Sequence, residues 1–364
     1  MFSNKDVSLK DNQLYQTFRD LPKIDLHRHL EGSVRLETLI EIAGDSGIEM
    51  PEYDAETLRP FVQMMPGETR NMQHFLGKFQ TLRQFYRSPD VIHRVAREAV
   101  EDAADDRIKY LELRFTPAAL SNIINCSYDE VVAWVCEAVD EAAQANDITV
   151  RLILSMNRNE SVEKGEQVLA AALKCQQKGV VAVDLAGNEA NFPSSPFSDI
   201  FRRAKAAGLG VTIHAGEWGD SANIREAVDD LGAARIGHGV RAIENGELVK
   251  MLADRGIVLE ICPTSNYQSG VVDSWAAHPL ADLWRQRVLT TINTDDPLVS
   301  GITLTDEMVR AVSHLSLTID DIKQHTLTAA QAAFLPDSER SALVNKFAVW
   351  LGLNHDNAEI PPAS

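Results

Sequence analysis

The sequence predicts a closed (β/α)8 TIM barrel, one domain over residues 1–364 with a helical lid insertion after its first strand, at residues 33–108. Eight short apolar runs alternate with amphipathic segments along nearly the whole chain. Alternating β and α units in this number are typical of a barrel, and near-continuous apolar runs suit a parallel sheet covered on both faces. An open doubly wound sheet would favour a glycine-rich phosphate turn, and neither G-x-G-x-x-G nor a P-loop motif occurs.

The expected strands are rich in Val, Ile and Leu. In chain order they cover residues 24–29, 110–115, 150–155, 180–186, 210–215, 234–238, 257–262 and 288–293.

Amphipathic helices are expected between these strands. Val91, Val95, Ala99 and Ala103 repeat at helical spacing, and the segment from 131 to 142 repeats in the same way. Three helices are each expected to end at a glycine that precedes a strand, because glycine readily adopts the left-handed conformation that stops a helix. These glycines are Gly179, Gly208 and Gly256, and a capping box is expected at Thr318 and Asp321.

The insertion follows from chain length, because about eighty residues separate the first two runs, more than a crossover needs. Within it, Phe75, Phe79, Leu82 and Tyr86 fall on one helical face. Two interpretations remain open. The stripe belongs to an extra helix that packs on the barrel, or it belongs to a lid whose apolar side covers a flat ligand.

Composition limits the partners and the compartment. The net charge of −18 disfavours nucleic acid and anionic membrane surfaces, which require concentrated Lys and Arg, but it does not exclude a neutral nucleoside. No apolar stretch approaches a membrane span, and residues 1–6 lack an apolar signal core. Four cysteines without a C-x-x-C pair indicate reduced thiols, so we expect a cytoplasmic protein. The tail 355–364 is expected to fray.

Polar side chains with metal-binding groups end four of the expected strands. His27 and His29 follow each other at i and i+2, so they share a face at the end of the first strand. Three further strands end in a set of histidines and aspartates, namely His214, His238 and the pair Asp295 and Asp296. A buried core histidine is the ordinary explanation for each one alone. Four such positions at the carboxyl rim, where barrels build their sites, favour a metal site.

Three histidines and one aspartate suit Zn²⁺ with one position left for water, and the bound water would become a nucleophile near neutral pH. We expect a single ion, because the fourth run ends without the lysine that a bridging ligand would need. Glu217 lies three residues after His214, where a dry pocket would raise its pKa and make it a proton donor. Asp295 and Asp296 are adjacent, so their side chains point in different directions. One can bind the metal while the other faces the ligand.

These motifs together resemble the adenosine deaminase family of the metal-dependent amidohydrolase superfamily. The matching stretches are His27-x-His-Leu-Glu-Gly32, Asp184-Leu-Ala-Gly187, His214-Ala-Gly-Glu217, Gly237-His-Gly239 and Asn293-Thr-Asp-Asp-Pro297. The resemblance runs in order from about residue 20 to residue 335, and the joint pattern is far more specific than any one motif.

The resemblance implies hydrolytic deamination of a purine 6-amino group, with adenosine and 2′-deoxyadenosine as substrates. His27, His29, His214 and Asp295 would hold one Zn²⁺. Glu217 would protonate ring N1, and His238 would orient the attacking hydroxide. Asp296, in its protonated form, would bond N7. Besides His29 at the metal, the implied substrate contacts are Glu31 at the sugar and the Gly187 N–H at N3.

Two positions depart from well-known members. Glu31 stands where many carry Asp, and Asn188 replaces a common acidic residue. Both bear on sugar-side specificity, so the alternative is a deaminase of a 5′-modified adenosine, such as aminodeoxyfutalosine, or of adenine. A catalytically dead binding protein would show a lost ligand, and every such position is filled. A secreted growth-factor-like member would need a signal peptide. A general amidohydrolase that acts on amides is compatible with the fold, but the His-Ala-Gly-Glu and Asp-Asp motifs favour a purine ring as the substrate. The sequence does not indicate an oligomeric state.

Overall fold

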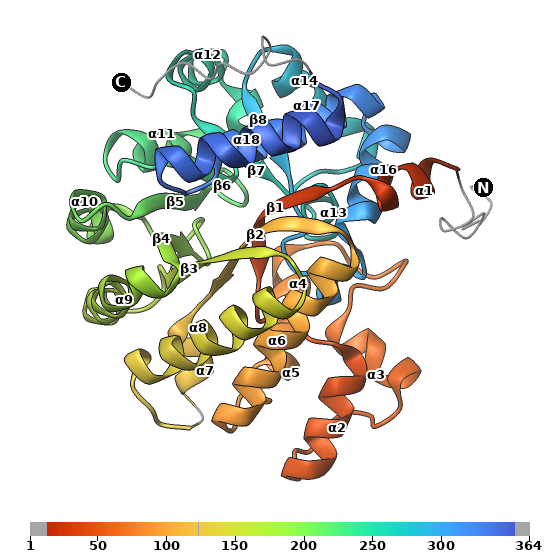
Figure 1. Ribbon diagram of the computed structural model, residues 1–364, viewed down its shortest axis with the longest axis vertical. Helices are drawn as coiled ribbons and strands as arrows, with labels where there is room; N and C mark the ends of the chain where they lie inside the picture. The colour runs from red at the N-terminus through yellow and green to blue at the C-terminus, as the bar shows by residue number, and fades with distance from the viewer. Residues whose placement is uncertain (1–12, 123, 354–364) are drawn as a thin grey trace.

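The computed structural model describes residues 13–122 and 124–353, in which eight parallel strands surround a central axis (Figure 1). The strands are β1 (Lys23–His29), β2 (Ile108–Phe115), β3 (Thr149–Asn157), β4 (Val180–Ala186), β5 (Gly210–Ala215), β6 (Arg235–His238), β7 (Val258–Ile261) and β8 (Leu289–Ile292). All eight predicted strands are confirmed. The largest differences are at the start of β2, at 108 instead of 110, and the end of β3, at 157 instead of 155. The predicted tail 355–364 lies outside the described residues.

The strands pair in chain order from β1 to β8, and Asp295 closes the barrel. The Asp295 N–H donates to the His27 carbonyl at 2.8 Å, and the His29 N–H donates to the Asp295 carbonyl at 2.8 Å. The (β/α)8 fold is therefore confirmed. The closing bond also fixes the backbone of Asp295 between the two histidines of β1.

Helices form the outer layer around the barrel (Figure 1). They are α1 (Gln13–Asp20), α2 (Leu36–Ser46), α3 (Ala55–Val62), α4 (Met72–Gly77), α5 (Phe79–Leu82), α6 (Pro89–Asp105), α7 (Pro117–Ser121), α8 (Tyr128–Ala145), α9 (Val162–Cys175), α10 (Ser198–Ala206), α11 (Ser221–Asp229), α12 (Gly246–Arg255), α13 (Pro263–Gln268), α14 (Leu280–Arg285), α15 (Pro297–Ser300), α16 (Leu304–His314), α17 (Ile319–Ala332) and α18 (Asp337–Leu351). Short 3-10 turns are η2 (Gln176–Lys178), η3 (Ser195–Phe197), η4 (Val240–Glu244) and η5 (Trp275–Ala277). Within the described ranges, none of the helices combines the length and apolar character needed to span a bilayer.

The predicted helix ends are confirmed. Gly179, Gly208 and Gly256 all have positive φ, between 64° and 95°, at the points where helical segments give way to strands. Thr318 and Asp321 form the predicted capping box at the start of α17. These local signals place the strands that follow them, and so the rim where the polar side chains gather.

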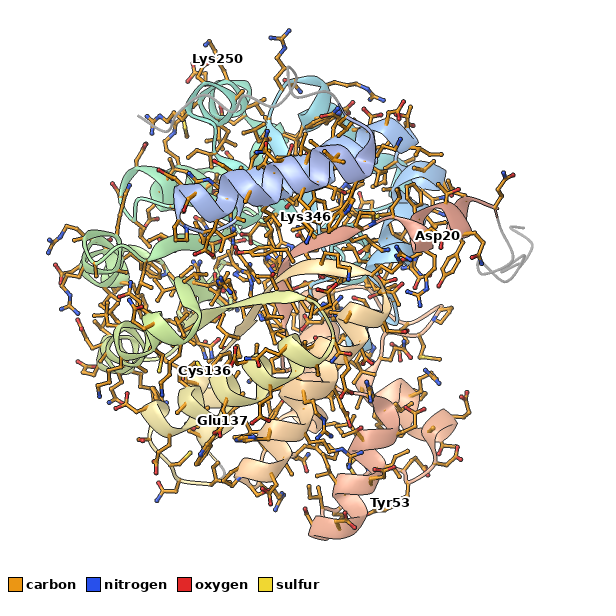
Figure 2. The ribbon with its side chains drawn as sticks, viewed as in Figure 1. Asp20, Tyr53, Cys136, Glu137, Lys250 and Lys346 are labelled. Atoms are coloured by element: carbon orange, nitrogen blue, oxygen red, sulfur yellow. The ribbon has the colours of Figure 1, made fainter. Side chains whose placement is uncertain are left out.

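The segment between β1 and β2 contains α2 to α6, of which α2 and α3 project away from the barrel (Figure 1). Tyr53, just before α3, lies at the outer end of this projection (Figure 2). The prediction that Phe75 to Tyr86 form one continuous helical stripe is wrong. The helix is interrupted after Gly77, where glycine weakens helical backbone, and Tyr86 lies beyond α5. The side chains of Phe75, Phe79, Leu82 and Tyr86 are nevertheless all buried.

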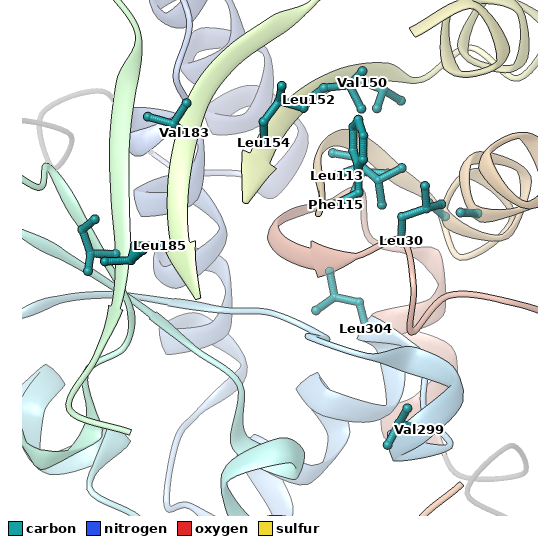
Figure 3. Close-up of a cluster of buried hydrophobic side chains, with 14 of the residues drawn as sticks. Leu30, Leu113, Phe115, Val150, Leu152, Leu154, Val183, Leu185, Val299 and Leu304 are labelled. Atoms are coloured by element: carbon teal, nitrogen blue, oxygen red, sulfur yellow. The ribbon is translucent and has the colours of Figure 1, made fainter. Parts of the chain in front are cut away.

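The strands present apolar side chains outward, toward the helices. Figure 3 shows Leu152 and Leu154 of β3 beside Val183 and Leu185 of β4, all in the buried apolar cluster. The alternate positions point into the barrel, as period-two geometry requires. The near-continuous apolar character that the sequence analysis ascribes to the strands does not extend to the barrel interior, which holds a set of charged residues. They are Glu112, Arg114, Asp184, Arg235 and Glu260, each at most 1% exposed.

Candidate active site

Four side chains that the sequence predicts as metal ligands converge at the carboxyl end of the barrel. Ligand atoms of His27, His29, His214 and Asp295 all lie within 4.8 Å of one another. The Nε2 atoms of His29 and His214 are 3.3 Å apart, and Asp295 Oδ1 is 3.2 Å from His27 Nε2. The β1, β5 and β8 ends therefore supply three nitrogens and one carboxylate, a donor set suited to a tetrahedral cation.

Buried carboxylates orient two of these imidazoles. Glu260 of β7 lies 2.8 Å from His27 Nδ1, and Asp184 of β4 lies 2.9 Å from His214 Nδ1. A carboxylate accepts the Nδ1–H, so each Nε2 is left with its lone pair facing the cluster. Such lone pairs repel one another unless a cation lies between them. His27 Nε2 is buried and has no hydrogen-bond partner among the described residues. These observations fit a bound metal.

Arg114 ties the two orienting carboxylates together inside the barrel. Its Nη2 donates to Glu260 at 2.7 Å, and its Nη1 lies 3.5 Å from Asp184. Burial alone would raise the pKa of Glu260, but Arg114 and Arg235 lower it well below its usual range. Glu260 therefore stays ionised and able to accept from His27. The charged barrel interior is thus a support for the candidate metal ligands.

A second group of candidate ligands overlaps the first and includes His238 and Cys262. Burial raises the pKa of Cys262 well above its usual range, so the sulfur stays a thiol. A thiol is a poor ligand compared with a thiolate. The set with His29 and His214 is therefore the better metal site.

Glu217 and His238 lie beside the cluster. Burial, together with the charges of Asp295 and Glu189, raises the pKa of Glu217 well above its usual range. His238 Nε2 lies 3.6 Å from Glu217 Oε2 and 3.9 Å from Asp295 Oδ2. His238 and Asp295 also have φ of 61°, an uncommon conformation for residues other than glycine. The raised pKa favours the neutral, protonated form of Glu217 in this pocket.

Asp296 lies outside the group of candidate ligands to which the adjacent Asp295 belongs. Burial and the neighbouring Asp295 raise the pKa of Asp296 well above its usual range. Its Oδ1 is buried and has no hydrogen-bond partner among the described residues. Asp296 lines one pocket with His29, Glu31, Gly187, His214, Glu217, His238 and Asp295. All the predicted site residues lie here, with His27 buried beneath the pocket.

Gly32 holds Asp296 in place by having no side chain. A Cβ at Gly32 would overlap the Asp296 carboxylate. We therefore expect Gly32→Ala to displace that carboxylate and to lower kcat/KM for adenosine, the substrate that the sequence motifs imply, by about 10- to 100-fold, because small misplacements in a site are costly. Steady-state kinetics and metal analysis test this, since the metal should be retained. Gly44→Ala, where a Cβ meets nothing within 4 Å, is the control. Equal kinetics for the two variants would contradict the packing argument.

Glu31 closes another side of the pocket. Its Oε1 accepts the Thr116 N–H at 2.8 Å, while Oε2 is buried with no hydrogen-bond partner among the described residues. Phe75 and Phe79 line the same pocket. The two aromatic rings of α4 and α5 therefore form an apolar wall, and Glu31 offers one free acceptor oxygen.

Sequence reasoning missed the residue that holds the Glu217 loop. Glu189 accepts the backbone N–H groups of Gly216, Glu217 and Trp218 at 2.8, 2.6 and 2.7 Å. Three donors on one carboxylate fix the loop that carries Glu217. Glu189 is visible in the sequence beside the Asp184-Leu-Ala-Gly187 motif, but only the fold shows that it reaches the β5 loop.

The chain is similar to known proteins over most of its length. A family model described as adenosine deaminase matches residues 22–350. An adenosine deaminase of Vibrio cholerae is 40% identical over 329 residues, 90% of this chain and 98% of the relative. An adenine deaminase structure from Arthrobacter aurescens is 26% identical, with a TM-score of 0.83, covering 91% of this chain and 99% of its own. An amidohydrolase structure from Burkholderia ambifaria with bound Zn is 27% identical, with a TM-score of 0.84, covering 95% and 96%. The chain therefore belongs to the adenosine deaminase family, as its motifs predict.

Proposed function

We propose that this protein is a zinc-dependent hydrolytic deaminase that converts adenosine and 2′-deoxyadenosine to inosine and deoxyinosine with release of ammonia. One observation carries the proposal. Four convergent ligand atoms lie in the same pocket as two carboxyl groups, Glu217 and Asp296, whose pKa values are both raised. Such a pair can donate protons to a planar nitrogen heterocycle beside a metal.

His27, His29, His214 and Asp295 would hold one Zn²⁺. When bound, this ion would lower the pKa of a water molecule and so supply a nucleophile at neutral pH. Glu260 and Asp184 hold the two imidazoles in the orientation that this role needs. A single ion is proposed because β4 ends at Ala186 and is followed by Gly187, without a lysine to bridge a second ion.

The ring is activated by protons that the pocket holds. Glu217 gives its proton to N1, which makes C6 electrophilic, and Asp296 donates a hydrogen bond to N7. The Gly187 N–H bonds N3 at the opposite edge. Water adds its oxygen to C6 and gives one of its protons to the amino nitrogen, and the bond from C6 to that nitrogen breaks so that ammonia leaves. The second water proton returns to Glu217, while N1 keeps the proton that it received. The sum is adenosine plus water giving inosine plus ammonia.

Glu31 is proposed to read the sugar. Its unpartnered Oε2 faces the pocket and can accept a hydrogen bond from a ribose hydroxyl. Glu31→Gln should raise KM for adenosine, with kcat/KM falling about 10-fold, because the amide can turn its NH₂ group toward the hydroxyl in place of an acceptor oxygen. The control is 5′-deoxyadenosine, whose kinetics should change little. An equal change for both substrates would mean that Glu31 does not contact the 5′-hydroxyl.

The alternative substrates are a 5′-modified adenosine, such as aminodeoxyfutalosine, and adenine. Glu31 favours the 5′-modified adenosine. Its side chain is longer than the Asp that many members carry, and it alters the pocket where the sugar would lie and not where the metal would lie. The test is the ultraviolet absorbance of zinc-loaded protein mixed with each compound, since conversion of a 6-amino to a 6-oxo purine shifts the band. Rapid conversion of adenosine supports the proposal, and conversion of only another compound would replace it.

The proposal also includes the cellular compartment of the protein and a lid over the pocket. All four cysteines are free thiols, which is consistent with a reducing cytoplasm. Within residues 33–108, Phe75 and Phe79 reach the pocket and would cover the purine face, so a lid role is proposed for this part of the insertion. The substrate is a small neutral molecule, in keeping with the net charge of −18.

A further inference from the structure

His238 faces the pocket with Nε2, and its other nitrogen faces a buried polar chain. Asn266, on α13, has its Nδ2 3.0 Å from His238 Nδ1. His278 has its Nε2 3.4 Å from Asn266 Oδ1. The backbone N–H of Leu280 donates to His278 Nδ1 at 3.2 Å. Asn266, His278 and His238 are at most 6% exposed, so water does not compete for these bonds.

The direction of each hydrogen bond follows from one fixed donor. A backbone N–H can only donate, so His278 Nδ1 must be an acceptor. Burial lowers the pKa of His278 to about 3, which keeps the ring neutral with its single proton on Nε2. That proton must go to an acceptor, so Asn266 presents Oδ1 to His278. The Asn266 amide N–H then faces His238.

The reversed amide of Asn266 would be unfavourable. It would set its NH₂ group against the Nε2–H of His278, so that two donors would face each other in a dry interior. The observed orientation leaves His238 Nδ1 as an acceptor. A neutral imidazole that accepts at Nδ1 carries its proton at Nε2, which is the atom that faces Glu217 and Asp295.

We propose that the Leu280 N–H, His278 and Asn266 form a relay that fixes the tautomer of His238, so that it presents Nε2–H to the reacting oxygen. Asn266 and His278 are positioning residues in this account, since neither lines the pocket. The fixed proton lets His238 orient a lone pair of that oxygen by donating to it. The inference rests on the proposed function for its kinetic consequence, but the tautomer itself can be observed without any substrate.

Asn266→Asp tests the relay, because it has the same shape but replaces the donor by an acceptor. The carboxylate still accepts from His278, and it now draws the His238 proton to Nδ1. We expect kcat for adenosine to fall by about 10²-fold or more, with KM little changed and zinc retained, as for other wrong-tautomer variants of catalytic histidines. Asn245→Asp is the matched control, since it makes the same amide-to-carboxylate change at the start of α12, where the Asn245 side chain accepts from the N–H groups of Glu247 and Leu248 and Asp can do the same.

His278→Gln retains a donor toward Asn266 and should lose much less kcat than Asn266→Asp. An equal loss in the two variants would indicate packing instead of proton placement and would overturn the proposal. A kcat for Asn266→Asp equal to that of the Asn245→Asp control would also overturn it.

Nitrogen NMR of protein with ¹⁵N-labelled histidine reads the tautomer directly and does not depend on turnover. The His238 resonances are assigned from their absence in His238→Gln. We expect an unprotonated Nδ1 and a protonated Nε2 in the unmodified protein, and the reverse or an imidazolium in Asn266→Asp. A protonated Nδ1 in the unmodified protein would refute the relay. Failure of the deaminase proposal would instead appear as absent turnover with the expected tautomer.

Discussion

Glu217→Gln is expected to retain zinc and to lower kcat for adenosine by about 10²- to 10⁴-fold, the usual range for loss of a general acid. The change removes the proton that N1 requires and keeps the shape of the side chain. The three backbone bonds from residues 216–218 to Glu189 do not involve the Glu217 side chain, so the loop should stay in place. Steady-state kinetics and elemental analysis for zinc measure the two expectations separately.

Glu247→Gln serves as the control for Glu217→Gln, because it makes the same chemical change at an exposed residue of α12 outside the site. If Glu217→Gln had the same kcat as this control, the assignment of Glu217 as the proton donor would be wrong. Loss of zinc in the same variant would mean that Glu217 acts through the metal site instead of through N1.

Asp295→Asn is expected to lose both metal and activity. The zinc content should fall from about one ion per chain to a small fraction, and kcat by at least about 10³-fold, because several kcal/mol of transition-state stabilisation disappear. Asn is preferable to Ala because Asp295 has φ of 61°, a conformation that Asn tolerates. The test therefore separates loss of the ligand from backbone strain.

Asp296→Asn is the matched control for Asp295→Asn, since the two residues are adjacent and the change is identical. It should retain zinc, because the Asp296 side chain points into the pocket instead of joining the ligand cluster. Elemental analysis that finds full zinc in Asp295→Asn, or lost zinc in Asp296→Asn, would contradict the ligand assignment.

Much of the fold could be predicted because the strands have strong local signals. Apolar runs and helix-ending glycines predicted the positions of eight strands. Because barrel sites lie at the carboxyl ends of the strands, His27, His214 and Asp295 could then be predicted to lie together. The charged interior was missed because a polar residue within an apolar run carries no sign of its partner. Arg114 and Glu260 are 146 positions apart in sequence, so they come into contact only when the barrel closes.

The supporting residues of the site could not be predicted for the same reason. Asn266 lies 28 positions after His238, and His278 lies 12 positions further on, spacings that correspond to no local geometry. The helical stripe from Phe75 to Tyr86 fails for a different reason, since a pattern of apolar spacing does not show where Gly77 will end a helix. Burial of the four side chains was still compatible with the pattern.

A zinc titration of metal-free protein, with adenosine turnover as the readout, tests the central claim most directly. We predict no turnover without metal, a linear rise up to one zinc ion per chain, and no further rise beyond it. Turnover by metal-free protein, or none after one ion is bound, would contradict a single zinc held by His27, His29, His214 and Asp295.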